Sequence, residues 1–301
     1  MIAALGGRLA ASALSIMLVL VASFALLKLA PGGPFDAERS APPEVIERLE
    51  ARYGLDQHWT SQLGTYLSGV LRGDLGPSYQ YPDYTVNQLI AAALPLTLGL
   101  GAAALALAIT LALPLSLFGV RPGWRLPVRA LATSLLTLPK FVLAPLLILL
   151  FAVNLQWLPA GGWNTSGWHW VLPVVTLAGP QLGVLLSALL QGMDEALAGD
   201  AVAAARTRGL SEARVLWYHA LPLALPLASA CLPTVAIALF TGSTIVEQVF
   251  GLPGLGRLLV QAAINRDYTV VLGCVLVVSA IVALINLLTE SIQRRIDPRG
   301  H

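Results

Sequence analysis

The sequence predicts an all-α polytopic membrane protein with six transmembrane helices, and three observations lead to this fold class. Of its 301 residues, 56% are hydrophobic and 11% are charged, whereas about 25% of the residues in soluble domains are charged. Six apolar stretches reach the length of about 20 residues that a helix needs to cross a bilayer. Arginines concentrate in alternate connecting segments, which is typical of proteins whose basic loops stay in the cytoplasm.

The six predicted spans belong to one transmembrane domain that comprises the whole chain. The first apolar stretch is longer than the roughly 7–15 residues of a signal-peptide core, so we interpret it as an uncleaved span. The predicted spans are 9–30, 94–118, 128–153, 171–193, 223–246 and 269–292.

The distribution of basic residues predicts that both termini lie in the cytoplasm. The segment 154–170 faces the opposite side, and it contains four tryptophans and no acidic or basic residue apart from one histidine. Tryptophans are typical of the membrane–water interface. The arginines in the predicted cytoplasmic segments are Arg8, Arg121, Arg125, Arg129, Arg206, Arg208, Arg214, Arg294, Arg295 and Arg299.

Two further segments are expected on the same outer side as 154–170. The cap segment (residues 31–93) is long and polar, and its composition predicts a small folded unit with a helix at 43–53. The second outer segment, 250–267, begins with closely spaced glycines and a proline and continues as a short amphipathic stretch at 255–264.

The residues that catalysis would require are scattered or missing, so we predict that the chain is not an enzyme. The four histidines fall on both sides of the predicted membrane, and Cys231 and Cys274 lie inside apolar runs. The only lysines are Lys28 and Lys140, neither follows a glycine, and no phosphate-binding G-x-x-x-x-G-K-[ST] motif occurs. We therefore expect no catalytic, metal or cofactor site in this chain, and the net charge of +2 without a basic block gives no reason to expect a nucleic-acid partner.

The hairpin segment (residues 194–221) is expected to be two short cytoplasmic helices, 195–208 and 212–221. Gly209 suits the left-handed position that ends a helix, Ser211 suits an N-cap, and Glu212 places an acid in the first turn of the second helix. Alanines at 201 and 203–205 leave a slim face that another protein can approach closely. On composition alone, an interfacial hairpin kept inside by its arginines is an equally good interpretation.

Residues 199–222 resemble the EAA loop of binding-protein-dependent ABC importers. Ala203, Ala204 and Ala205 begin the motif, Gly209 follows, and Leu221-Pro222 ends it. Ala203 replaces the usual glutamate, and His219 replaces an apolar residue. The dipeptide, oligopeptide and nickel branch of the family has a variant of this loop, although its usual tyrosine is Ala201 here. The residues that match the variant are Asp200, Ala205, Arg206, Arg208, Gly209 and Leu210.

Further motifs in the same order as in that branch extend the resemblance over nearly the whole chain. The resemblance implies the type I ABC importer architecture, with six transmembrane helices and cytoplasmic coupling helices. The motifs are Tyr53-Gly-Leu-Asp56, Leu71-Arg-Gly-Asp-Leu-Gly76, Leu138-Pro139, the sequence 155–161, the sequence 245–257, Asn265-Arg-Asp-Tyr268 and the sequence 296–299.

The resemblance implies a permease subunit in the inner membrane that imports small peptides, or nickel and metal-chelate complexes, by alternating access. Its implied partners are two ATP-binding cassette subunits that bind ATP and magnesium, a second homologous permease subunit and an external solute-binding protein. The residues implied to couple the permease to the ATPase are Ala203, Ala204, Ala205, Arg206, Arg208, Gly209, Leu210, Ser211 and Glu212.

Two charged residues within the predicted spans are candidates for the translocation path. Lys140 follows Pro139 in the middle of the third span, where the family usually has serine, and it either faces the path or pairs with a neighbouring carbonyl. Glu247 ends the fifth span, and we favour a structural carboxylate that holds the glycine-rich segment after it.

Two other classes of function remain open at this stage. An ATP-independent secondary transporter or channel would also span the membrane, but the sequence has few carboxylates within the spans for ion coupling and no visible inverted repeat. A purely structural membrane protein would leave the cap segment and the capped hairpin without a role.

Overall fold

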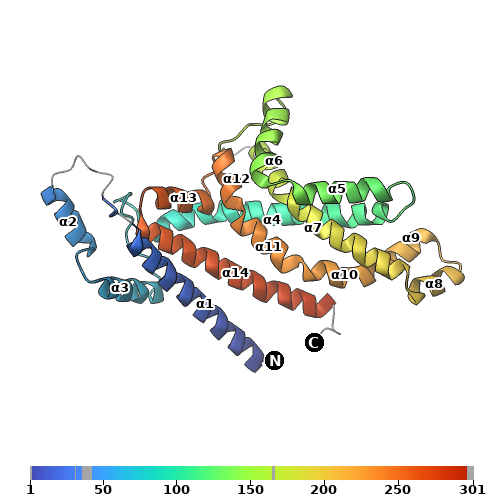
Figure 1. The fold of residues 1–301 in the computed structure, drawn as a ribbon, viewed down its shortest axis with the longest axis horizontal. Helices are drawn as coiled ribbons and strands as arrows, with labels where there is room; N and C mark the ends of the chain where they lie inside the picture. The colour runs from blue at the N-terminus through green and yellow to red at the C-terminus, as the bar shows by residue number, and fades with distance from the viewer. Residues whose placement is uncertain (1, 31, 36–42, 165–166, 297–301) are drawn as a thin grey trace. The chain divides into compact units, whose positions relative to one another are not determined.

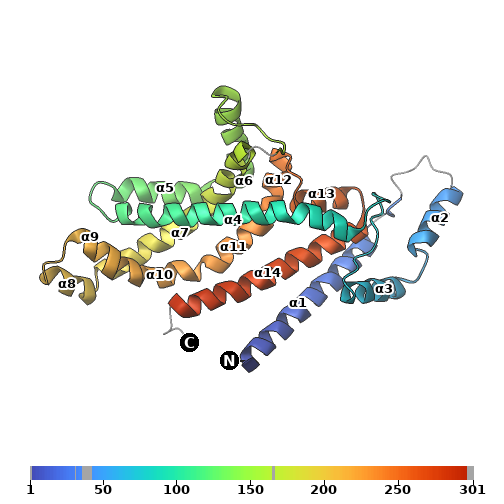
Figure 2. The same cartoon turned by 180° about the vertical axis from the view of Figure 1, so that it is seen from behind.

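The computed structural model describes residues 2–30, 32–35, 43–164 and 167–296, and Figures 1 and 2 show their helices from opposite sides. Within these ranges the regular structure is helical, and the sole bridge between extended residues joins Pro77 to Thr85. The described chain therefore has the all-α class that the sequence predicts. It forms two compact units, Met1–Pro95 with Pro253–Ala283 and Leu96–Leu252 with Leu284–His301.

The first unit contains the N-terminal helix and the cap segment. Its core is the small apolar cluster that includes Val86, Leu255 and Cys274. The helix α1 is largely exposed, as expected for a lipid-facing span. The helices of this unit are α1 (Ile2–Leu29), α2 (Pro43–Tyr53), α3 (Trp59–Leu71), the first part of α4 (Val86–Gly119), α13 (Leu255–Ile264) and the first part of α14 (Tyr268–Ile296).

The second unit is built around α7 (Val171–Leu197), the most buried of the long apolar helices that the structure describes. It packs along α5 (Arg125–Thr137) and α10 (Leu221–Ala230), and together they form the larger apolar core. This unit also contains the part of α4 from residue 96 onward and the part of α14 from residue 284 onward. Its remaining helices are α6 (Lys140–Leu147), the π-helix Ile148–Asn154, the short helix Gly167–Trp170, α8 (Asp200–Thr207), α9 (Glu212–Val215), the π-helix Leu216–Ala220, α11 (Leu232–Thr241) and α12 (Ser243–Phe250).

Five helices of the described chain are long and apolar enough to cross a membrane. The predicted third span, 128–153, is not one helix, because α5 and the helix Lys140–Asn154 are bent by 107° against each other. Pro139 explains the break, since a proline disfavours the helical conformation of the residue before it, and Leu138 has the extended ψ of 112°. The number of spans is six when this bent pair counts as one span.

The predicted fifth span, 223–246, is also divided. It begins in α10, passes through α11 and ends in α12, with interruptions at Cys231 and Gly242. The stretch Leu232–Phe250 alone meets the length and hydropathy of a span. Pro233 lies at the start of α11, where its missing N–H costs no helical hydrogen bond.

The short helices of the two outer segments form as expected. The structure has α2 at Pro43–Tyr53 and α13 at Leu255–Ile264, with the same bounds as the predicted stretches. Gly254 is extended immediately before α13 and Gly251 is left-handed at the end of α12, so the glycines mark the helix ends. The motif at 296–299 lies outside the described residues apart from Ile296.

Candidate functional site

The hairpin segment contains two short helices, but the first is shorter than predicted. The helix α7 continues through the expected membrane boundary to Leu197, and α8 begins only at Asp200. Gly199 has an extended backbone and separates the two helices, so the expected single helix from 195 to 208 is wrong at its start. The second helix begins at Glu212 as predicted, and its α-helical turn passes directly into the π-helix Leu216–Ala220.

The turn between α8 and α9 places all three residues at the positions that the sequence predicts. Gly209 has a φ of 78°, the left-handed conformation expected after a helix. Glu212 occupies the first turn of α9. Ser211 occupies the N-cap position as predicted, with an extended backbone, although its side chain makes no capping hydrogen bond.

An exposed ion pair closes the turn. The Arg206 guanidinium donates to both carboxylate oxygens of Glu212, with Nη2–Oε1 at 2.6 Å and Nε–Oε2 at 3.3 Å. This hydrogen bonding raises the pKa of Arg206 above its ordinary value. The residue therefore stays charged at any pH at which the protein would be studied.

One face of α8 is buried and the other is open. Val202 and Ala205 are buried, and Leu210 packs against the apolar core of the second unit. The remaining predicted coupling residues are exposed, and α8 therefore presents a narrow surface of small and basic side chains on a well-anchored base. These exposed residues are Ala203, Ala204, Arg206, Arg208, Gly209, Ser211 and Glu212.

A carboxylate that the sequence analysis did not single out anchors the start of the hairpin segment. Asp194, in the last turns of α7, accepts a hydrogen bond from Arg129 of α5, and its other oxygen lies 3.5 Å from Nη2 of Arg125. The sequence signal that could have found this site was an acid just after the predicted span 171–193 and two arginines around the start of the predicted span 128–153. Their pairing depends on the packing of α5 against α7.

Lys140 begins α6 at the break that follows Pro139, and it is half-buried. Its Nζ donates to the carbonyl oxygen of Ala238 in α11 at 2.9 Å. Insertion scales assign a cost of about 2.5–3.5 kcal/mol to a lysine at the centre of a spanning helix. The bond to a carbonyl offsets part of this cost, which is one of the two interpretations that the sequence allowed, and a role in the path stays a prediction.

Glu247 is fully buried in α12. Its Oε1 accepts a hydrogen bond from the hydroxyl of Thr97 in α4 at 2.7 Å. No feature of the sequence pointed to this partner, which is 150 residues away. The described structure places no ion pair between Glu247 and Lys140, so the two candidate path residues do not form one site.

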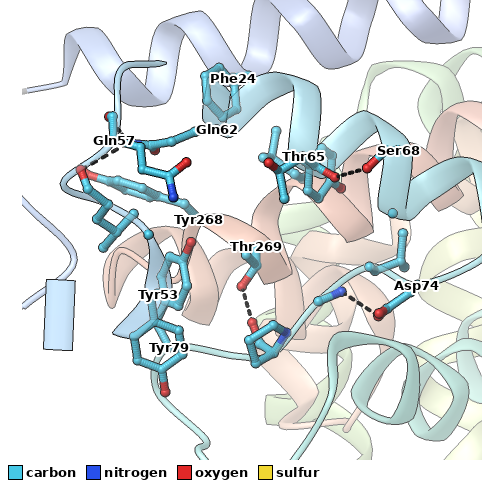
Figure 3. A pocket seen from close by; sticks show the side chains of 18 of the residues that line it. Phe24, Tyr53, Gln57, Gln62, Thr65, Ser68, Asp74, Tyr79, Tyr268 and Thr269 are labelled. Atoms are coloured by element: carbon cyan, nitrogen blue, oxygen red, sulfur yellow. Dashed lines mark hydrogen bonds between the residues drawn. The ribbon is translucent and has the colours of Figure 1, made fainter. Parts of the chain in front are cut away.

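In the first unit, three of the family-like motifs meet around one cavity of about 470 Å³ (Figure 3). Tyr53 comes from the motif 53–56, Asp74 from the motif 71–76 and Tyr268 from the motif 265–268. Tyr79 and Thr269 also line the cavity. The rings of Tyr53 and Tyr79 lie 5.0 Å apart in an edge-on contact. The cavity is thus lined by aromatic, hydroxyl and charged side chains from segments far apart in the sequence.

The buried carboxylate of Asp267 organises this region. One oxygen accepts hydrogen bonds from the Ser78 hydroxyl and the backbone N–H of Gln80, and the other accepts from the Thr269 hydroxyl and the backbone N–H of Val270. The bond to Val270 caps the start of α14. Burial raises the pKa of Tyr79, and the negative charge of Asp267 adds to this shift. The sequence analysis identified the motif 265–268, but it did not predict that Asp267 is a buried acceptor of hydrogen bonds.

The helical order, the broken spans and the anchored hairpin together form a fold that occurs in solved ABC transporters. It is similar to that of a chain in an inward-facing MetNI methionine ABC transporter, with a TM-score of 0.59 and 20% identity over 70% of this chain and 97% of that chain. A chain from a crystal structure of an amino acid ABC transporter matches with a TM-score of 0.55 and 20% identity, over 69% of this chain and 94% of that chain. At this identity the likeness concerns the fold.

Residues 104–300 match the family of binding-protein-dependent transport system inner membrane components, and the chain belongs to this family. It is 38% identical to the oligopeptide transport system permease protein OppB of Salmonella typhimurium, over 95% of this chain and 94% of that protein. It is 34% identical to the dipeptide transport system permease protein DppB of Bacillus subtilis, over 97% of this chain and 96% of that protein. The family resemblance found in the sequence motifs is confirmed.

Proposed function

We propose that this chain is a permease subunit that imports small peptides in an ATP-driven complex. The observation that carries this proposal is similarity over at least 94% of the length of both an oligopeptide and a dipeptide permease. Because the similarity extends over the cap segment as well as the spans, it supports a shared transport task and not only a shared membrane fold.

The proposed complex contains two ATP-binding cassette subunits, a second homologous permease and an external binding protein that delivers the peptide. ATP and magnesium bind to the cassette subunits, since this chain has no phosphate-binding motif of its own. The arginines that concentrate in alternate loops support an orientation with both termini in the cytoplasm.

In this proposal the exposed face of α8 docks on a cassette subunit. Small side chains at 203 and 204 allow close approach, and Arg206 and Arg208 supply charged donors beside them. The buried side chains of Val202 and Ala205 tie α8 to the core, and the segment after α9 continues without a break into α10. A displacement of α8 is therefore transmitted to α7 and α10, which pack along each other.

The test is peptide uptake by the complete complex in liposomes, with Gly209→Trp as the disruptive variant. Gly123→Trp is a matched control, because both glycines have a positive φ and neither has another atom within 4 Å of the position of a Cβ. We expect Gly209→Trp to lower ATP-driven uptake at least tenfold and Gly123→Trp to leave it within about twofold. Uptake by this chain alone without ATP would instead show an independent transporter or channel.

A further inference from the structure

Two broken helices of the second unit meet at Lys140. The lysine begins α6 after the break at 138–139, and Ala238 and Gly242 lie at the end of α11 where the next break occurs. From this meeting point we propose that Lys140 binds the carboxylate of the peptide during translocation. This inference rests on the function proposed above.

The ammonium group of Lys140 has unused bonding capacity. It carries three donors, and its hydrogen bond to the Ala238 carbonyl uses one of them. The same carbonyl also accepts from the N–H of Gly242 at 3.1 Å, so it is shared between two donors. Among the described residues no carboxylate forms an ion pair with Lys140, and the positive charge is not neutralised within this unit.

Gly242 makes room for the lysine. A Cβ at this position would lie 2.3 Å from Nζ of Lys140 and 2.4 Å from the oxygen of Ala238. Both distances are shorter than non-bonded atoms tolerate, so any other residue would displace the ammonium group or the helix end. Gly242, directly after α11, therefore leaves room for the ammonium group of Lys140 beside the Ala238 carbonyl.

Four residues that neighbour Lys140 or the end of α11 in the sequence have exposed side chains. They are Thr137, Pro139, Phe141 and Thr241. Interrupted helices with a charged residue occur at membrane depth where they line a cavity or are covered by protein. In transporters, such interruptions are typical of sites that bind the charged groups of the substrate.

A carboxylate is the ligand that these groups recognise. Lys140 supplies a cation with free N–H donors, and charge-assisted bonds from ammonium to carboxylate are among the strong hydrogen bonds in proteins. The hydroxyls of Thr137 and Thr241 already donate to helix carbonyls, so their oxygens are left to accept from a peptide N–H. Every unmodified linear peptide carries one such carboxylate at its C-terminus.

The experiment compares uptake of one tripeptide as the free acid and as the C-terminal amide. The complete complex is reconstituted in liposomes, and both peptides are supplied at concentrations that saturate the binding protein. Lys140→Met removes the charge and Lys140→Arg keeps it. Lys28→Met is the matched control, because Lys28 is the only other lysine in the chain.

We expect Lys140→Met to lower the ratio of acid to amide uptake about tenfold, and Lys140→Arg and Lys28→Met to leave this ratio within about twofold. An unchanged ratio in Lys140→Met, with peptide import intact or equally reduced for both peptides, would overturn the inference and leave the proposed function in place. Absence of any peptide import by the wild-type complex would overturn the proposed function, and the inference with it.

A labelling experiment keeps the inference testable if Lys140→Met assembles poorly. Lys140→Cys is placed in a chain whose two natural cysteines, Cys231 and Cys274, are replaced by alanine. An anionic methanethiosulfonate reagent is expected to label this cysteine during ATP turnover, and the transported peptide is expected to slow the labelling by occupying the same position. A cysteine that stays unlabelled in all states, or whose labelling the peptide does not slow, would contradict a substrate site at this position.

Discussion

The cap segment and the hairpin segment are held in place by different kinds of interaction. Near the cavity of the first unit, the buried carboxylate of Asp267 accepts four hydrogen bonds from two stretches of chain. In the hairpin segment, a few apolar side chains and the exposed Arg206–Glu212 pair hold α8 and α9. Buried hydrogen bonds to charge are costly to break, whereas exposed ion pairs contribute little. The region around Asp267 is thus held by interactions that are costly to break, and the turn of the hairpin is closed by a weak one.

The largest effect is expected at Asp267. Asp267→Ala leaves the buried Ser78 hydroxyl and the backbone N–H of Val270 without their acceptor, which we expect to destabilise the first unit by about 2–4 kcal/mol. The Thr269 hydroxyl and the Gln80 N–H keep the Pro77 carbonyl and the Ser78 hydroxyl oxygen as acceptors. Thermal unfolding and limited proteolysis of the cap segment in detergent measure the effect. Asp83→Ala is the control, because Asp83 is an exposed acid in the same segment. Equal protease resistance of the two variants would mean that Asp267 does not hold the cap.

An intermediate effect is expected at the buried side of α8. Val202→Ala removes two methyl groups from a fully buried side chain and should cost about 1–2 kcal/mol through lost burial and a residual cavity. Proteolysis of the isolated permease at the hairpin segment should become faster, and that at the cap segment should not change. Ala203→Ser, at the neighbouring exposed residue, is the control, and it should leave the proteolysis rates of both segments unchanged. Faster cleavage in both segments would show that the two regions unfold together.

The smallest effect is expected for the exposed ion pair. Arg206→Ala and Glu212→Ala should each cost about 0.5 kcal/mol or less, since both side chains are about half exposed and solvent screens their interaction. The folded-state pKa of Arg206 is raised, so this contribution is present at low and neutral pH and is lost only as the pH rises through that value, far into the alkaline range. A double-mutant cycle at pH 6 and pH 9 should give the same small coupling. A coupling above 1.5 kcal/mol would contradict the contrast between the two regions.

The local patterns of the sequence were sufficient for the fold class and for several helix ends. Long apolar stretches predict spanning helices because a helix satisfies its backbone within lipid, and the glycines at 209 and 251 mark helix ends because they adopt a left-handed backbone without strain. The same local rules placed α2 and α13 at their observed bounds. The motifs of the hairpin segment identified the family, which the similarity to known permeases confirms.

Contacts between distant parts of the chain could be identified only from the tertiary structure. Ser78 and Asp267 are 189 residues apart, Thr97 and Glu247 are 150 apart, and no local pattern pairs them. The sequence predicted one continuous span at 128–153 and not the 107° bend at Pro139, because the angle depends on how α6 packs against α7 and α12. It likewise placed Lys140 within a span, whereas only the packed helices bring its ammonium group to the Ala238 carbonyl beside Gly242. Hydrophobicity and helix-end preferences act between neighbours in the chain, but buried polar partners are chosen by packing.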